Sequence, residues 1–121
     1  IEFHGNLYNI FCTKCHEKIS YEEYKESYLH AKDHGIIRPG IVLYGEPINE
    51  MVLTESIKAI QNSDLVIIAG TSFVVYPFAQ LLAYRQAAAK VWVINNTPVP
   101  APKEVLTIIE NAEKVFDKLY I

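Results

Sequence analysis

A short apolar run that ends in glycine, threonine and serine constrains the fold of this chain more than any other feature. Residues 65–69 read Leu-Val-Ile-Ile-Ala, and Gly70, Thr71 and Ser72 follow directly. A strand that is apolar at every position is typical of a parallel sheet covered on both faces. Small residues after such a strand expose N–H groups and hydroxyls at the carboxyl edge of the sheet, where open α/β folds bind nucleotides. The segment therefore predicts a parallel sheet with a nucleotide-binding edge.

Apolar runs and helix-like stretches alternate along the chain after Ile36. Further strands are predicted by the apolar runs at 41–44, 91–94 and 105–109. Helices are predicted over 50–60, over 77–89 and after Asn111. Asn49 and Asn111 stand where helix N-caps are expected. Alternation of this kind predicts an α/β fold, a Rossmann-like parallel half-sheet with helices.

The N-terminal part of the chain has a different composition. Residues 1–36 hold both cysteines and all four histidines. We therefore expect two parts: a small Cys/His module over 1–36 and part of a Rossmann-like domain over 37–121.

Charge and length exclude several classes of protein. The chain has 121 residues, is 50% apolar and carries a formal net charge of −3. It lacks the basic excess of nucleic-acid-binding proteins, and no apolar run approaches the roughly 20 residues of a membrane span. Two closely spaced cysteines favour a metal or redox site over a structural disulfide, which fits a cytoplasmic location. The sequence does not begin with methionine, so we expect it to be part of a longer protein.

The two cysteines begin a pattern of metal-ligand spacing. Cys12-x2-Cys15-x14-His30-x3-His34 matches the spacing of many Cys2His2 zinc sites. The opposing interpretation is a pair of free thiols beside solvent-exposed histidines. The spacing predicts a single zinc ion, with Cys12 and Cys15 as the first two ligands and His30 as the third.

A series of short motifs gives the chain a family resemblance. In order they are His4-Gly5, Cys12-x-x-Cys15, Ile37-Arg38-Pro39, Val42-Leu43-Tyr44-Gly45-Glu46, Gly70-Thr71-Ser72-x-Val74-x-x-Pro77 and Ile94-Asn95. This series resembles the C-terminal half of the sirtuins, the NAD-dependent protein-lysine deacylases. The glycine-alanine-glycine motif of the sirtuin N-terminal half does not occur in this sequence. The resemblance thus covers nearly all of this chain but only about half of a sirtuin.

The resemblance implies a function for the longer protein. A sirtuin consumes NAD and an acyl-lysine protein or peptide, and yields nicotinamide, deacylated lysine and O-acyl-ADP-ribose. His4 falls at the position of the sirtuin base that activates a ribose hydroxyl. This chain by itself is expected to be inactive.

The resemblance also implies binding residues. Contacts to NAD are implied for Gly70, Thr71, Ser72, Asn95 and Ala112. The two sides of the acyl-lysine cleft are implied at Val42, Tyr44, Gly45 and Glu46, and at Val74, Val75 and Tyr76. Sirtuins hold zinc through two Cys-x-x-Cys pairs, and the second pair falls here at His30 and Asp33, where the chain has no cysteine. Asp33 and His34 therefore remain alternatives for the fourth zinc ligand.

Two other functions remain open on the sequence. The first is a truncated, non-catalytic half-sirtuin that only binds a nucleotide or associates with other chains. The second is a nucleotide-binding domain of the thiamine-enzyme type, against which His4, Cys12 and Cys15 argue. Half a sheet also leaves apolar surface uncovered, so we expect self-association.

Overall fold

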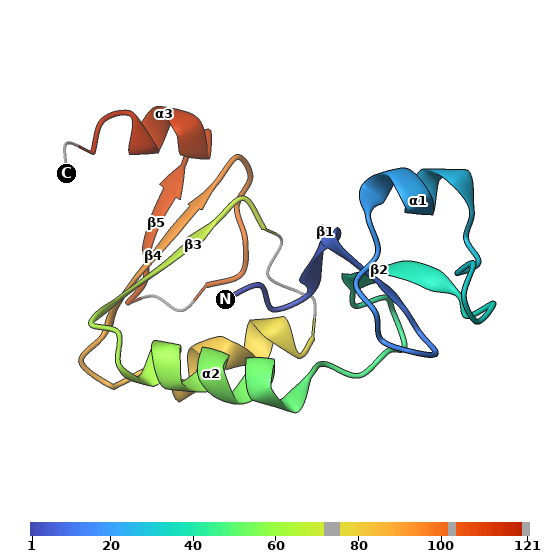
Figure 1. Ribbon diagram of the computed structural model, residues 1–121. Helices are drawn as coiled ribbons and strands as arrows, with labels where there is room; N and C mark the ends of the chain where they lie inside the picture. The colour runs from blue at the N-terminus through green and yellow to red at the C-terminus, as the bar shows by residue number, and fades with distance from the viewer. Residues whose placement is uncertain (72–75, 102–103, 120–121) are drawn as a thin grey trace. The chain divides into compact units, whose positions relative to one another are not determined.

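The chain divides into two compact units. A computed structural model describes residues 1–71, 76–101 and 104–119, and its units are Ile1–Leu53 and Thr54–Ile121 (Figure 1). The first unit extends beyond the 1–36 module expected from the sequence, because a strand that follows Ile36 pairs back onto the N-terminal strand.

The first unit is built on an antiparallel pair of strands, β1 (Gly5–Cys12) and β2 (Ile37–Ile41). Helix α1 (Tyr21–Glu26) lies between them in the sequence and is capped by Ser20. The core of this unit consists of buried apolar side chains from β1, β2 and the intervening segment, with Tyr24 of α1 packed against them: Ile10, Cys12, Ile19 and Ile37. Only a small core supports this unit, so other interactions must help to hold it together.

The strand expected over 41–44 was wrong in both position and pairing. The observed strand ends at Ile41 and pairs with β1 instead of joining the parallel sheet. The chain turns at this point, because the Glu46 N–H donates to the Leu43 carbonyl at 3.0 Å and Gly45 has a φ of +88°. A left-handed residue of this kind interrupts an extended strand.

The second unit contains a parallel sheet with strand order β3-β4-β5. Its strands are β3 (Leu65–Ala69), β4 (Lys90–Asn95) and β5 (Leu106–Ile109). Helix α2 (Glu50–Gln61) precedes β3 and crosses from the first unit into the second, and α3 (Ala112–Phe116) follows β5. The Rossmann-like parallel half-sheet predicted from the sequence is confirmed.

Two predicted helix starts are confirmed and one predicted helix is corrected. The Asn49 carboxamide oxygen accepts the Met51 N–H at 2.9 Å, and Asn111 accepts the Glu113 N–H at 2.9 Å. The helix expected over 77–89 is instead a short 3₁₀ segment, η1 (Phe78–Tyr84). It ends early because Arg85 takes an extended backbone conformation, with φ −62° and ψ 152°, and the chain turns toward β4.

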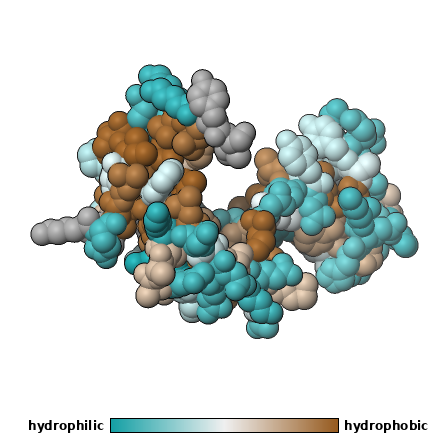
Figure 2. All heavy atoms as spheres, turned by 90° about the vertical axis from the view of Figure 1, so that its left-hand side faces the viewer, coloured by the Kyte–Doolittle hydropathy of each residue, from teal (hydrophilic) through white to brown (hydrophobic). Residues whose placement is uncertain are grey.

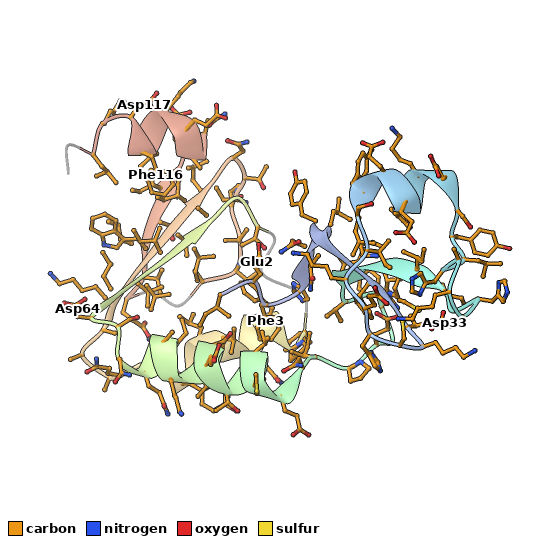
Figure 3. The ribbon with its side chains drawn as sticks, in the orientation of Figure 1. Glu2, Phe3, Asp33, Asp64, Phe116 and Asp117 are labelled. Carbon is orange, nitrogen blue, oxygen red and sulfur yellow. The ribbon has the colours of Figure 1, made fainter. Side chains whose placement is uncertain are left out.

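The outer strands of the sheet keep apolar side chains at the surface. Leu65 and Ile67 of β3 and Leu106 and Ile109 of β5 are each more than a third exposed. Hydrophobic side chains gather visibly on the face drawn in Figure 2. On α3, Phe116 lies on the side toward the strands and Asp117 on the opposite side (Figure 3). Among the described residues, no helix has the length and apolar character needed to cross a membrane.

Candidate functional site

The carboxyl ends of the three parallel strands form one edge of the sheet. Ala69 of β3 is paired with Ile94 of β4, and Asn95 is paired with Ile109 of β5. This register brings Gly70, Asn95 and Ala112 to the same edge, because each of them ends a strand or follows one closely. Open parallel sheets bind ligands at such an edge. Ser72, which belongs to the same predicted set, lies outside the described residues.

Gly70 is required at this edge by its backbone conformation. Its φ is +64°, and its N–H donates to the Ile94 carbonyl at 3.0 Å. A Cβ at this position would meet no atom within 4 Å, so open space lies beside the glycine. The left-handed conformation therefore excludes most other residues, while the free space leaves room for a ligand to approach the backbone.

Thr71 lines a hollow next to this edge. The hollow has a volume of 390 Å³ and is formed by side chains of α2, β3 and η1, including Ile60, Ala69 and Leu81. Its walls are almost entirely apolar, apart from Thr71. Such a hollow suits the flat, weakly polar part of a ligand whose polar part lies at the strand ends.

Asn95 and Ala112 differ in what they offer a ligand. The Asn95 side-chain amide donates to the Thr97 carbonyl at 3.0 Å, so it holds the turn that follows β4. Ala112 is half-buried as the first residue of α3. Asn95 thus has a structural role in the turn besides the contact to NAD that the resemblance implies.

The first unit holds the candidate base beside a candidate substrate-binding residue. The Val42 N–H donates to the His4 carbonyl at 2.9 Å, which continues the pairing of β1 and β2 by one step. The His4 side chain is exposed and meets the Phe3 ring edge-on, with ring centroids 5.1 Å apart. The β1–β2 pairing therefore fixes the backbone of His4 while its imidazole stays accessible.

An ion pair ties down the segment that follows Val42. The Arg38 guanidinium forms a two-pronged salt bridge with the Glu46 carboxylate and also donates to the Ile41 carbonyl at 2.9 Å. Glu46 accepts the Leu43 N–H at 3.0 Å as well. The Arg38 guanidinium, followed by the Leu43 N–H, lowers the pKa of Glu46 to about 2. The carboxylate therefore stays charged at neutral pH and acts as a clamp on this turn.

The clamped turn presents the other predicted substrate-binding residues to solvent. Tyr44 is 96% exposed, and Gly45 follows it at the tip of the turn. Val42 and Glu46 line a groove of 580 Å³ along β2. Tyr76 is exposed in the second unit, whereas Val74 and Val75 lie outside the described residues.

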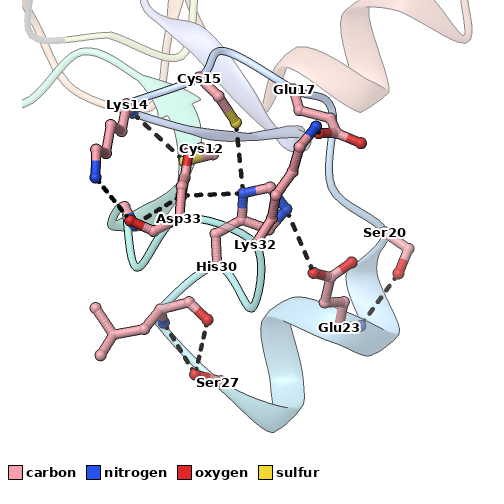
Figure 4. A network of polar contacts seen from close by, with 12 residues as sticks. Cys12, Lys14, Cys15, Glu17, Ser20, Glu23, Ser27, His30, Lys32 and Asp33 are labelled. Carbon is pink, nitrogen blue, oxygen red and sulfur yellow. Dashed lines mark hydrogen bonds and ion pairs between the residues drawn. The ribbon is translucent and has the colours of Figure 1, made fainter.

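Four of the five predicted metal ligands come together in the first unit. Cys12, Cys15, His30 and Asp33 each offer a donor atom, and these four atoms all lie within 4.8 Å of one another. The Cys15 Sγ lies 3.4 Å from the His30 Nδ1 (Figure 4). The Asp33 Oδ1 lies 3.3 Å from that Nδ1 and 3.4 Å from the Cys12 Sγ. Zinc bonds of about 2.0 to 2.3 Å place the ligand atoms of a tetrahedral site about 3.3 to 3.8 Å apart. These three separations fit the edges of such a tetrahedron.

The chemistry of the four donors also suits a divalent cation. The Gly35 N–H, followed by the Cys15 thiol, holds the pKa of the Asp33 carboxyl well below its usual range. Asp33 is therefore a carboxylate at neutral pH. Two thiols, one imidazole nitrogen and one carboxylate are all recognised zinc ligands.

His34 does not join this group in the described part of the chain. It is exposed, has a φ of +57°, and donates its N–H to the His30 carbonyl at 2.8 Å. Of the two alternatives for the fourth ligand, the structure brings Asp33 to the other three donors and turns His34 away.

One residue near the cluster was missed by the sequence reasoning. Glu23 of α1 places its Oε1 3.9 Å from the His30 Nε2. The sequence does contain a signal for its position, because Ser20-x-x-Glu23 is a capping-box pattern. The Ser20 hydroxyl accepts the Glu23 N–H at 3.1 Å, which fixes Glu23 in the first turn of the helix.

Comparisons with known proteins match the whole of this chain. An NAD-dependent protein deacetylase of Lactiplantibacillus plantarum is 41% identical over 121 residues, which are 100% of this chain and 52% of that protein. A solved structure of Sir2Tm bound to a propionylated peptide superposes with a TM-score of 0.88 and 27% identity, over 98% of this chain and 53% of the other. A complex described as Sir2-p53 peptide-NAD+ gives a TM-score of 0.84 and 28% identity, over 98% of this chain and 54% of the other.

The share of each protein that is matched determines which conclusions these similarities support. The chain spans about half the length of the proteins that it matches. The sequence profile of the Sir2 family covers residues 1–77, well over half of the chain. The Lactiplantibacillus protein is also 41% identical over all 121 residues. The chain therefore belongs to the Sir2 family.

Proposed function

We propose that this chain is part of an NAD-dependent protein-lysine deacylase. The hydrogen bond between the Val42 N–H and the His4 carbonyl carries the proposal. It sets an accessible imidazole beside the strand end that would receive an acyl-lysine peptide. A similar protein over the full length of this chain is named as an NAD-dependent protein deacetylase. The proposal extends that activity to the longer protein of which this chain would form one part.

The residues of the first unit would bind and activate the peptide side of the reaction. The backbone of Val42 would pair with an extended acyl-lysine peptide, since an added strand is recognised through main-chain hydrogen bonds. Tyr44 and Gly45 would border the bound side chain, and the Arg38–Glu46 ion pair would hold their turn in place. His4 would act as the general base, because its exposed imidazole has a ring nitrogen that can accept a proton from a ribose hydroxyl.

The residues of the second unit would bind NAD. Gly70 and Thr71, together with Ser72, would lie against its phosphate and ribose groups, while Asn95 and Ala112 would lie near the adenosine. The positive φ of Gly70 and the open space beside it fit a ligand that approaches the backbone closely. Bound NAD would supply the ribose carbon that the acyl oxygen attacks, with nicotinamide as the group that leaves that carbon. Val74, Val75 and Tyr76 would form the second side of the peptide cleft.

A zinc ion would complete the N-terminal module. We assign Cys12, Cys15, His30 and Asp33 as its ligands, on the separations of their donor atoms. The ion would act structurally, because four protein ligands leave no open coordination position. In this proposal residues 1–36 carry the metal and the base, and the parallel sheet of the NAD-binding domain lies within residues 37–121. Free thiols that serve as metal ligands also favour a cytoplasmic location.

A nicotinamide-release assay tests the deacylase proposal. With NAD and an acetyl-lysine peptide, the 121-residue chain is expected to give no turnover, because catalysis by positioning fails when the reacting groups are only partly held. A chimera that adds the unmatched half of the Lactiplantibacillus relative is expected to release nicotinamide and deacetylated peptide. An inactive but folded chimera that binds both substrates would contradict the proposal. Turnover by the 121-residue chain would contradict the half-enzyme interpretation.

A second function, association without catalysis, is favoured by the exposed apolar side chains of the sheet. Leu65, Ile67, Leu106 and Ile109 lie on the outer strands and are each more than a third exposed. The 121-residue chain is therefore expected to form dimers or larger species, since apolar area removed from water stabilises association by about 25 cal/mol per Å². Light scattering at high micromolar concentration measures this. A homogeneous monomer would contradict it, and Leu106→Lys should shift any oligomer toward the monomer.

A further inference from the structure

We propose that Glu23 is a positioning residue for His30: its carboxylate accepts a hydrogen bond from the Nε2–H and so leaves Nδ1 as the nitrogen that binds the metal. This inference rests on the zinc site proposed above. It assigns a role to a residue outside the four ligands and outside the motifs that carry the family resemblance.

The two nitrogens of the His30 ring face different groups. Nδ1 lies 3.4 Å from the Cys15 Sγ and 3.3 Å from the Asp33 Oδ1, inside the donor cluster. Nε2 points away from the cluster toward α1, where the Glu23 Oε1 lies 3.9 Å away (Figure 4). The ring therefore spans from the metal ligands on one side to the carboxylate on the other.

A neutral imidazole has one proton for two nitrogens. If Nδ1 provides the lone pair for zinc, the proton must be on Nε2. His30 is only 5% exposed, so an Nε2–H without an acceptor would lose much of its solvation. Glu23 faces that nitrogen with an acceptor that carries a full negative charge. Metal-binding histidines commonly donate their second N–H to a carboxylate, which fixes the tautomer and the ring orientation.

The fold holds the Glu23 backbone in place but leaves its side chain adjustable. Its N–H is bonded to the Ser20 hydroxyl, and the next residue, Tyr24, packs against the core. The Glu23 side chain is 43% exposed, so a change of rotamer can shorten the 3.9 Å separation to a hydrogen bond. The nearby Lys32 forms a salt bridge with Glu17 instead, with its Nζ 2.9 Å from the Glu17 Oε2.

Metal affinity of matched variants tests the inference. Glu23→Ala removes the acceptor, Glu23→Gln keeps an oxygen acceptor without the charge, and Glu26→Ala removes an equal charge from the same helix. Zinc competition against a chromophoric chelator is expected to show about tenfold weaker binding for Glu23→Ala, since such outer partners contribute about 10- to 100-fold to affinity. Glu23→Gln should recover most of the affinity, and Glu26→Ala should match the unsubstituted chain. Far-UV circular dichroism checks that all variants keep their helices.

The tautomer of His30 provides a readout that general destabilisation of α1 would not change. Two-bond ¹H–¹⁵N spectra of the zinc-loaded chain are expected to show the proton on Nε2, and Glu23→Ala, which lacks the acceptor for that proton, is expected to mix the two tautomers. Equal zinc affinity for Glu23→Ala and the unsubstituted chain, or an unchanged tautomer in that variant, would overturn the positioning role and leave the zinc site standing. Absence of zinc binding by the unsubstituted chain would instead overturn the metal site, and this inference with it.

Discussion

His4→Ala in the active chimera is expected to lower deacylation by about 10²- to 10⁴-fold, the range that a positioned general base contributes. Alanine removes the imidazole but keeps the His4 carbonyl, which accepts the Val42 N–H and continues the strand pairing. The side chain is exposed, so its removal leaves the core intact. NAD affinity should stay nearly unchanged, because the base acts in the reaction and not in ground-state binding.

Steady-state formation of deacetylated peptide, with NAD binding measured by calorimetry, checks this result. His16→Asn serves as the control, since His16 is an exposed histidine with a φ of 59°, which asparagine tolerates better than alanine. Full activity of His4→Ala would refute the assignment of the base. Equal losses in both variants would point to a general effect of removing histidine.

Loss of the metal is expected to unfold the first unit. The 121-residue chain should bind one zinc after refolding with the metal, and Cys15→Ser should bind less than about a tenth of an equivalent. Zinc binding supplies folding free energy directly, about 2.7 kcal/mol at a free concentration one hundred times Kd. Cys15 is the informative position because its thiol is exposed, whereas Cys12 is buried in the core and its loss would also disturb packing.

Elemental analysis and thermal unfolding with and without a chelator measure this effect. Asp33→Ala should behave like Cys15→Ser, whereas His34→Asn should keep the metal, because His34 lies outside the four donors. A chain that keeps less than about a tenth of an equivalent of zinc would contradict the site. Retention of zinc by Asp33→Ala but not by His34→Asn would reverse the choice of fourth ligand.

Because the thiols and the imidazole must release protons to bind zinc, the affinity for zinc should fall as the pH is lowered.

Local signals predicted the second unit well. The strand Leu65–Ala69 was predicted residue for residue, because a fully apolar run is bounded by Asp64 and Gly70. Asn49 and Asn111 were predicted as helix caps, because a side-chain amide next to a helix start has a short-range partner. In each case the interaction that decides the structure lies within a few residues of the pattern that predicts it.

Long-range pairing explains most of what the sequence did not predict. Strand β1 mixes polar and apolar residues, and its register is set by β2, which lies beyond α1 in the sequence. The turn at 42–46 depends on Arg38 meeting Glu46, a side-chain contact that periodicity cannot reveal. The choice of Asp33 over His34 likewise depended on the left-handed backbone at His34.

The four donors of the metal cluster all lie between Cys12 and Asp33, and the strand that closes around them ends at Ile41. Short loops between ligands keep the entropy of loop closure small. Contacts between sequence neighbours also form faster than contacts between distant segments. With the zinc site proposed above, the first unit is expected to acquire its ion and fold during translation, before strands β3, β4 and β5 have been synthesised. In a cell, zinc supply during synthesis would then decide how much of the protein is correctly folded.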